Sequence, residues 1–244
     1  NVGTFTGNAT DNTAITGIGF QPKFMFVKNG PTAVAAVSSQ AESYGDDTSF
    51  FSATANLVDA VQSLDSDGFT VGTNSVANGS TNAMYWAAFT GGAAPSSSGT
   101  FQMNSGTYTG TGLPQSITGV GFKPDLVIIK AQTTQASVFR TSAMSGDSTA
   151  YIDSATANLA GAITAINGNG FSIGTSATVS TSGTTYYWTA YGNAWEPENN
   201  AGASDFYVGA YFTPATAIDS QNITRLPFQA DLVTIKANAA AAGT

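Results

Sequence analysis

Short apolar runs separated by turns rich in Gly, Asn, Ser and Thr form the basic pattern of this chain. Phe24–Val27 and Leu126–Ile129 are apolar without interruption, which is typical of strands buried on both faces at the centre of a sandwich. Residues 68–73 and 170–175 alternate Phe and Val or Ile with Thr, Ser or Gly, and this alternation predicts strands with one buried face. Residues 184–191 have strand composition as well.

One segment has an ambiguous pattern. Leu57, Val61 and Leu64 recur at nearly helical spacing, which allows a single helical turn there without changing the fold class. The pattern as a whole predicts an all-β fold made of jelly-roll-like β-sandwich modules. Trp86 and Trp188 stand at equivalent places and are expected in the cores.

The chain contains two copies of one long module and the beginning of a third. The motif Ile-Thr-Gly-x-Gly-Phe-x-Pro at 15–22 recurs at 117–124, a displacement of 102 residues, as from Phe20 to Phe122. The same displacement relates two further motifs, Ser-Ala-Thr-Ala-Asn-Leu at 52–57 and 154–159, and Tyr-Trp-x-Ala-aromatic at 85–89 and 187–191. A third copy follows the first motif from Ile223, with both glycines and the later proline altered, and continues to Lys236.

These repeats predict a division of the chain into five segments. They are a sandwich module at 1–93, a linker at 94–105, a second module at 106–194, a linker at 195–204 and the first strands of a third module at 205–244.

Three apolar residues of the third copy, Leu232, Val233 and Ile235, are candidate assembly residues. They need the rest of a module to cover them, because an uncovered strand edge is a template for pairing with another chain. Either the chain continues beyond Thr244, or a neighbouring subunit completes the third module by strand addition.

Composition excludes several classes of function. Charged residues are 9% of the chain, against about a quarter in ordinary domains, and there is no Cys or His. Disulfides, thiolate or imidazole metal sites and Ser-His-Asp catalysis are thereby excluded. A net charge of −8 with scattered cations argues against nucleic acid as a partner, and no apolar stretch is long enough for membrane insertion as a helix.

The same composition favours an extracellular, cell-surface or virion location. Acidic chains without cysteine and with many hydroxyl side chains are common among exposed proteins. The chain starts at Asn1 without Met, from which we expect that a leader was removed, that a longer chain was cut or that the start is internal.

The repeated motifs resemble the modules of about a hundred residues found in predicted phage tail and tail-fibre proteins and in tandem in large bacterial surface proteins. The resemblance is carried by the Ile-Thr-Gly-x-Gly-Phe-x-Pro motif with its following apolar strand, by residues 65–73 and by residues 85–89. It implies a β-sandwich building block of fibres or surface proteins, without established catalysis. The second module has Asn-Gly-Asn-Gly at 167–170 in place of Asp-Ser-Asp-Gly, which argues against a role that needs charge there.

Four aspartates are weak calcium candidates. Asp65 and Asp67 alternate before Gly68 as in half of a calcium loop, and Asp46 and Asp47 follow Gly45 in another loop. A structural turn is the favoured interpretation, because Asp and Asn bond their own backbone in turns and the second module has Asn. We therefore expect no cofactor, with calcium as the alternative.

Two further sets of residues carry hypotheses. Tyr186, Tyr187 and Trp195 could stack on a sugar, as aromatic side chains do in carbohydrate-binding modules, although strand alternation would send some of them into the core. The lysines that end the three copies of the apolar strand are expected to bond a carbonyl or a carboxylate at the core rim; they are Lys28, Lys130 and Lys236.

The sequence therefore predicts a non-enzymatic extracellular structural protein. It would be the repeat of a surface filament, an adhesin stalk or a virion fibre, and it would assemble as a homopolymer or with neighbouring modules of the same chain through its partial third module. The alternative is a carbohydrate-binding receptor module with a glycan as partner. A pair of catalytic carboxylates is not expected, because the acidic residues lie mostly in turns and linkers.

Overall fold

The computed structural model describes most of both repeats and parts of the third. The described residues are 1–31, 35–39 (backbone), 46–91, 101–154, 156–193, 206–211, 223, 226, 228–230, 232, 233, 235 and 236. We call the described residues between 206 and 236 the third segment.

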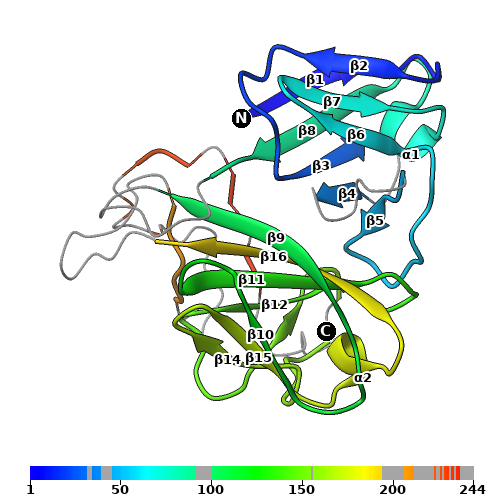
Figure 1. Ribbon diagram of the computed structural model, residues 1–244. Coiled ribbons are helices and arrows are strands. Elements are labelled where there is room, and N and C mark those ends of the chain that lie inside the picture. Colours follow the sequence, from blue (N-terminus) through cyan, green and yellow to red (C-terminus); the bar gives the residue numbers. More distant parts are fainter. Residues whose placement is uncertain are drawn as a thin grey trace, which may run out of the picture.

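The first half of the chain folds into a two-sheet sandwich, here called the first sandwich (Figure 1). Its strands are β1 (Val2–Thr6), β2 (Thr13–Thr16), β3 (Phe24–Asn29), β4 (Ala35–Ser39), β5 (Ser49–Phe50), β6 (Val61–Asp65), β7 (Gly68–Val71) and β8 (Ala83–Phe89), with the helical turn α1 (Ser75–Asn78) after β7. One sheet has the order β1-β8-β3-β4-β5 and the other the order β2-β7-β6, and every strand pair in them is antiparallel.

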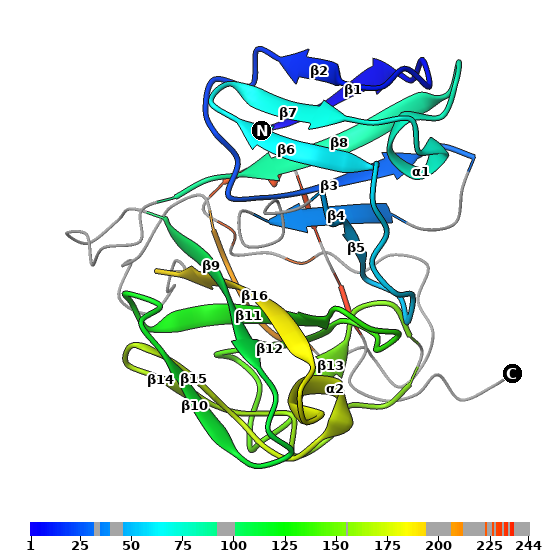
Figure 2. The ribbon, with the colours of Figure 1, turned by 45° about the vertical axis from the view of Figure 1, so that its right-hand side comes forward.

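The second sandwich has the same strand order. It consists of β9 (Gln102–Thr109), β10 (Gln115–Thr118), β11 (Pro124–Ala131), β12 (Val138–Thr141), β13 (Ala150–Tyr151), β14 (Ile163–Asn167), β15 (Gly170–Ile173) and β16 (Thr185–Gly192), with α2 (Ala177–Ser180) after β15. Its sheets run β9-β16-β11-β12-β13 and β10-β15-β14. Figure 2 shows the two sandwiches one above the other, with β5 reaching down towards the second. The all-β sandwich fold expected from the sequence is confirmed.

Equivalent strands pair in equivalent register. In the first sandwich Phe24 lies opposite Phe89 and Val27 opposite Trp86. In the second, the same four positions pair Leu126 with Tyr191 and Ile129 with Trp188. The repeat in the sequence is thus a repeat of strand pairing, although the division into domains itself stays a prediction.

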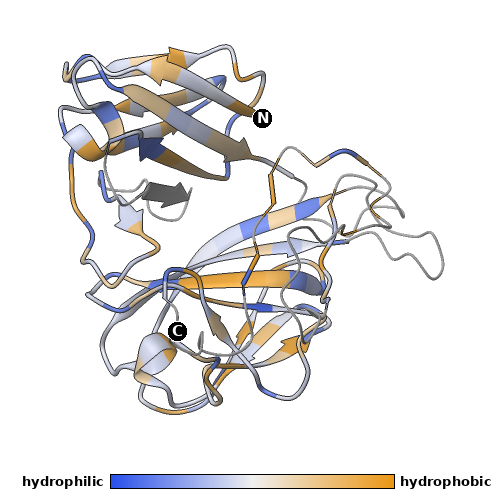
Figure 3. Ribbon diagram, turned by 180° about the vertical axis from the view of Figure 1, so that it is seen from behind, coloured by the Kyte–Doolittle hydropathy of each residue, from blue (hydrophilic) through white to orange (hydrophobic). Residues whose placement is uncertain are grey.

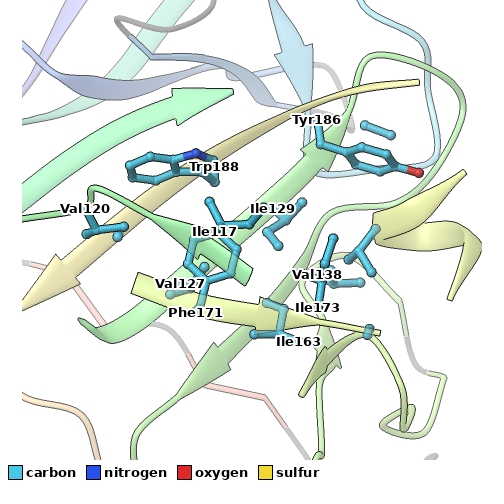
Figure 4. Packing of buried hydrophobic residues seen from close by; sticks show 14 of the residues in the cluster. Ile117, Val120, Val127, Ile129, Val138, Ile163, Phe171, Ile173, Tyr186 and Trp188 are labelled. Carbon is cyan, nitrogen blue, oxygen red and sulfur yellow. The ribbon is translucent and has the colours of Figure 1, made fainter. Parts of the chain in front are cut away.

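Each sandwich has its own core between its two sheets. In the second, side chains from β11 meet side chains from β14 and β15, and Figure 4 shows Val127 and Ile129 pointing towards Ile163, Phe171 and Ile173. All five are at most 1% exposed. Figure 3 shows the apolar character of β11 in the middle of this half of the molecule. Burial of these side chains is the main favourable term of the fold.

Val61 and Leu64 of the ambiguous segment lie in strand β6, whereas Leu57 precedes the strand and makes an isolated bridge with Thr48; residues 57–64 contain no helical turn. A β-bulge between Val61 and Ser63 shifts the register of β6 against β7. The extra residue puts Val61 and Leu64 on the same buried face in spite of their spacing of three, so the apparent helical period comes from the bulge. The helical turns lie instead at α1 and α2.

The predicted linker at 94–105 includes at its end residues that belong to a strand. β9 begins at Gln102, and Met103 pairs with Tyr191 and is fully buried. The start of this strand is hard to recognise in the sequence because residues 104–106 are polar or Gly. Its apolar residue Met103 packs outside the sandwich core, in a cluster described below. The second predicted linker, 195–204, lies outside the described residues.

Trp188 is buried in the second core, as expected, whereas Trp86 is partly buried against the first core; each lies over a glycine on the neighbouring strand. Each indole meets a Phe ring edge to face, Trp86 with Phe69 and Trp188 with Phe171, at 5.9 Å and 73° in both sandwiches. A Cβ atom on Gly106 would lie 2.5 Å from Cζ2 of Trp188. The glycine is therefore required by the closeness of the ring.

Replacing Gly106 with Ala should displace this ring and destabilise the second sandwich. We expect G106A to lower the free energy of unfolding by about 1–3 kcal/mol, the usual cost of overpacking. Gly168, whose added Cβ would meet nothing within 4 Å, supplies the control G168A with little change. Urea unfolding followed by tryptophan fluorescence measures both, and equal stability of the two variants would contradict the packing argument.

Candidate functional site

The most extensive feature outside the two cores is the junction between the sandwiches. β3 and β11 are apolar on both faces: Met25 and Val127 point into their own cores, whereas Phe24 and Leu126 point outwards. The outward residues of both sandwiches meet in one cluster with a residue of the third segment. This junction cluster comprises Phe24, Phe26, Phe51, Phe89, Phe101, Met103, Leu126, Ile128, Tyr191 and Phe206.

Tyr191 is the aromatic centre of the junction cluster. Its ring centroid lies 6.2 Å from that of Phe24, 6.3 Å from that of Phe89 and 6.1 Å from that of Phe206. The side chain is 5% exposed, and burial raises the pKa of its hydroxyl well above the ordinary value. Aromatic pairs in such edge-on and tilted geometry add to the burial of area, so the junction is a packed contact and not a loose hinge.

Main-chain hydrogen bonds from the loop after β5 reinforce the junction. Ser137 of the second sandwich donates its backbone N–H to the carbonyl of Phe51 at 2.8 Å and its hydroxyl to the carbonyl of Phe50 at 3.1 Å. Asn56 donates its backbone N–H to the carbonyl of Gln132 at 3.4 Å. The loop of the first sandwich is therefore held along the edge of the second.

Lys130 places a cation at this contact. Its Nζ donates to the carbonyl oxygens of Thr133 at 2.9 Å and Gln135 at 2.6 Å in its own sandwich, and to that of Thr54 at 3.0 Å in the first. Lys130 is 5% exposed, so its charge is compensated by these main-chain dipoles.

The same contact recurs one copy later. Lys236 of the third segment donates to the carbonyls of Ser154 and Thr156, and Lys236 and Thr156 are equivalent to Lys130 and Thr54. Lys28, the first of the three lysines, donates to the carbonyls of Asn29 at 2.5 Å and Gly30 at 3.5 Å. The prediction that these lysines bond a carbonyl is confirmed. The sequence did not predict that Lys130 and Lys236 would bond carbonyls of the preceding copy.

A signal for this acceptor loop was present in the sequence. The six residues of Ser-Ala-Thr-Ala-Asn-Leu are identical at 52–57 and 154–159, more than a solvent-facing loop requires. Because the lysine bonds main-chain carbonyls, this identity indicates a constrained loop but does not identify the lysine as its partner.

The candidate assembly residues are exposed. Leu232 is 46%, Val233 63% and Ile235 61% exposed. The positions equivalent to Val233 and Ile235 in the second sandwich, Val127 and Ile129, are fully buried beneath β14 and β15. The third segment thus presents apolar side chains that the complete copies cover.

Asp65 and Asp67 accept hydrogen bonds from the protein's own backbone and hydroxyls, but Asp67 bonds a distant loop and not the backbone of its own turn. The carboxylate of Asp67 accepts the N–H groups of Gly17 at 3.1 Å and Gly19 at 2.6 Å, holding the loop that precedes β3. Asn169 accepts the N–H of Gly121, the equivalent of Gly19, with its single amide oxygen at 2.7 Å, so this one bond needs an acceptor and no charge. Asp65 accepts the hydroxyls of Ser63 and Thr70, both at 2.8 Å.

Asp46 and Asp47 lie near the junction but do not join Asp65 and Asp67. Asp46 accepts the N–H of Asp59 at 3.0 Å, and burial, together with the nearby Asp59, Asp11 and Asp47, raises its pKa. Asp47 accepts from the side chains of Gln132 and Tyr187 across the junction, at 3.3 and 3.4 Å. Within the described ranges, no three His, Cys, Asp or Glu side chains are grouped so that they could hold a metal ion.

The aromatic residues proposed for sugar stacking are corrected by the structure. Tyr186 is fully buried, stacked on Tyr108 at 5.1 Å, and its hydroxyl donates to the carbonyl of Ala177 at 2.8 Å. Tyr187 is 9% exposed and faces Asp47. Neither ring offers a face to a ligand, because consecutive residues of β16 are covered on both sides. Trp195 lies outside the described residues.

A shallow pocket of about 310 Å³ lies beside Arg140. It is lined by Lys123, Arg140, Thr141, Ser142, Gly146, Thr164, Ala165 and Ile166. The guanidinium of Arg140 donates to the carbonyls of Ser148 at 2.6 Å, Met144 at 3.1 Å and Gly146 at 2.5 Å. Arg140 thus fixes the loop before β13, and the lining supplies no carboxylate for acid-base chemistry.

Comparisons with known proteins give a family match for part of the chain, and its description names no activity. Residues 97–210 match a family model described as a domain of unknown function (DUF7483). The match covers the second sandwich and the described start of the third segment. Searches of curated proteins and of solved structures gave no match. In the described part of the chain, no helix is long and apolar enough to cross a membrane.

Substitutions of Asp67 distinguish its role as an acceptor for backbone N–H groups from a role as a calcium ligand. We expect D67N to cost less than D67A, because its amide oxygen can keep the bond to Gly19, as Asn169 keeps the bond to Gly121, whereas D67A loses both N–H bonds and should cost about 1 kcal/mol. Urea unfolding with added calcium and with a chelator measures both. Calcium-dependent stability that D67N abolishes would contradict the role as an acceptor for backbone N–H groups.

Removing the ammonium of Lys130 should weaken the junction. We expect K130M to lower the free energy of unfolding by about 1.5–3 kcal/mol, the range for hydrogen bonds to charged groups, because three carbonyls lose their donor. The control K123M, at an exposed lysine of the same sandwich, should stay within about 0.5 kcal/mol of the unmodified chain. Similar effects of the two variants would show that the carbonyl contacts contribute nothing.

Proposed function

We propose that this protein is a non-enzymatic structural repeat of an extracellular filament, adhesin stalk or virion fibre. The observation that carries the proposal is the repeated junction: the contact between Lys130 and Thr54 is made again between Lys236 and Thr156. A contact that recurs from copy to copy in one chain supports an assembly in which each unit packs on its neighbour in the same way, as in other repeat proteins.

The junction is suited to mechanical work. It combines the apolar junction cluster, main-chain hydrogen bonds and a buried ammonium. In this proposal, such an interface holds the two sandwiches in a fixed relative orientation, which a flexible linker would not do. A fibre needs this property, since the orientation of each unit must be passed on to the next.

The surface chemistry supports an exposed location. The chain has a net charge of −8 with few charged residues of either sign, and it has no Cys to cross-link neighbouring molecules. The carbohydrate-binding alternative has lost its proposed platform, since Tyr186 and Tyr187 are buried. We therefore carry the structural role forward alone.

Assembly proceeds, in this proposal, through the third segment. Val233 and Ile235 correspond to positions that β14 and β15 cover in the second sandwich, with Ile163, Phe171 and Ile173 as the covering side chains. A hairpin of the same kind, from further along the chain or from a neighbouring molecule, would complete the third module by strand complementation.

The exposed residues of the third segment should drive self-association of residues 1–244. We expect sizing chromatography to show association that grows with concentration, and the double variant V233S/I235S to reduce it without lowering the melting temperature, because both side chains are exposed. The matched control is V127S/I129S, at the equivalent buried positions, which should destabilise the second sandwich by several kcal/mol.

A chain that stays monomeric at all concentrations, with or without the substitutions, would contradict assembly through the third segment. Negative-stain electron microscopy of the native material tests the fibre itself. We expect regular filaments or stalks, and the absence of any ordered assembly in native material would overturn the proposed structural role.

A further inference from the structure

The junction closes a loop in the chain that connects the two sandwiches. Gly91 follows β8, and Met103 lies twelve residues later in β9. A Cβ atom on Gly91 would lie 3.0 Å from Cβ of Met103, so the two residues are in contact. An extended chain of twelve residues spans about 40 Å. The connection between the sandwiches therefore contains length that the folded protein does not use.

Contacts with the first sandwich hold this loop closed. Phe89 at the end of β8 and Met103 near the start of β9 both belong to the junction cluster. Nζ of Lys23, a residue of the first sandwich, donates to the carbonyl of Met103 at 3.4 Å. Figure 1 shows the end of β8 and the start of β9 on the same side of the molecule. The sandwiches are thus joined twice, by these contacts and by the chain between Gly91 and Met103.

Tension between the sandwiches acts first on the contacts. The side chains of the junction cluster already touch, whereas the chain between Gly91 and Met103 becomes taut only after an extension of about 40 Å. When two connections act in parallel, the shorter one carries the load. The junction therefore carries the load until it opens.

The junction also covers the mechanically weak end of the second sandwich. Gln102 at the start of β9 lies opposite Gly192 at the end of β16, so the chain enters and leaves this sandwich at the same end of one antiparallel pair. A pull at that end loads the hydrogen bonds one pair after another, because they run perpendicular to the strands. Met103 and Tyr191, the next pair inwards, lie in the junction cluster. The closed cluster therefore protects the end at which the two strands would begin to separate.

We propose that the junction is a sacrificial mechanical contact, which opens under tension before either sandwich unfolds and releases the chain between Gly91 and Met103. This inference rests on the proposed structural role and adds the response of its repeating unit to load. The contact closes again when the tension falls, because closing the cluster buries its apolar side chains, whereas the entropic cost of closing a loop grows only slowly with its length.

Pulling on single molecules of residues 1–244 in optical tweezers tests this order of events. The chain has no Cys, so the variant S66C/E196C provides its only two attachment points. Ser66 is exposed in the turn between β6 and β7, and position 196 lies in the predicted second linker, so the third segment stays outside the loaded path.

We expect a first, reversible step of about 40 Å in contour length, followed at higher force by the unfolding of the sandwiches. The second sandwich, from Gln102 to Gly192, would release about 300 Å when it unfolds, so the two kinds of step are easily separated. Relaxing the molecule after the first step should restore that step in the next pull.

A longer linker identifies the source of the first step. Ten Gly and Ser residues inserted after Pro95 should lengthen the step by about 35 Å and leave its force unchanged, because the insertion lies outside the contacts that break. Loops tolerate such insertions with little loss of stability.

A substitution in the junction cluster should change the force of the first step. We expect Y191A to lower this force, because the Tyr191 ring contacts both Phe24 and Phe89. The matched control is I173A in the core of the second sandwich, which should lower the force of the later, larger step and leave the first step unchanged. Circular dichroism verifies that both variants are folded, and the insertion variant tests the proposal independently of them.

Three outcomes would overturn the sacrificial contact. They are extension of the linker without a force threshold, a first step that does not lengthen with the insertion, and unfolding of a sandwich before the short step. Failure of this inference is distinguishable from failure of the proposed function. Filaments in native material whose chain shows no short step would keep the structural role and remove the sacrificial contact, whereas a short step in a protein that forms no ordered assembly would keep the contact and remove the fibre.

Discussion

The central strand of each five-stranded sheet is apolar on both faces, and this requirement for two partners governs the rest of the structure. The inward side chains of β3 and β11 are satisfied by the three-stranded sheet of the same sandwich. Among the described residues, the outward ones are covered by the other sandwich and by the third segment, and not by the second sheet of their own sandwich. Docking of one sandwich on the next is therefore a condition for burying the strand and not an addition to a finished fold.

Duplication shows which details of the module are fixed by packing. The two Trp-Phe pairs have the same distance and angle, and both Trp rings exclude a Cβ on the glycine beneath them. The turn before β7 and β15 can contain a charged or a neutral residue, because Asp67 and Asn169 each accept an N–H of the glycine loop with an oxygen atom. The positions of the side chains are the same in both sandwiches where a Trp ring packs closely on a glycine. The residue type differs where either Asp or Asn can accept the hydrogen bond.

Most of the fold could be predicted from the sequence because the strand signals were local. The uninterrupted apolar runs are β3 and β11, and the alternating segments after Gly68 and Gly170 are β7 and β15. The segment at Leu57–Leu64 was ambiguous because a bulge gives a strand an odd spacing, and a bulge leaves no mark in a single sequence. The early start of β9 was missed because its burial comes from the neighbouring sandwich.

The site was harder to predict, because its contacts lie between copies and involve the main chain. Tyr186 and Tyr187 are adjacent in an aromatic strand that is covered on both faces, and alternation alone could not show the second cover. The repeated lysine was correctly expected to bond a carbonyl, but residue 130 reaches a loop 76 residues earlier. Such a partner becomes visible when the two sandwiches are placed together.

Recognition of backbone carbonyls by Lys130 and Lys236 has a consequence for how such a protein can evolve. Carbonyl oxygens are present whatever the side chains, so the loop that accepts the lysine can change its sequence without losing the contact, provided that its path is kept. Copies that diverge in this loop can then keep the lysine contact, whereas the apolar side chains of the junction cluster must still fit. A chain built in this way can gain or lose units wherever a new boundary keeps both the path of the loop and the packing of the cluster.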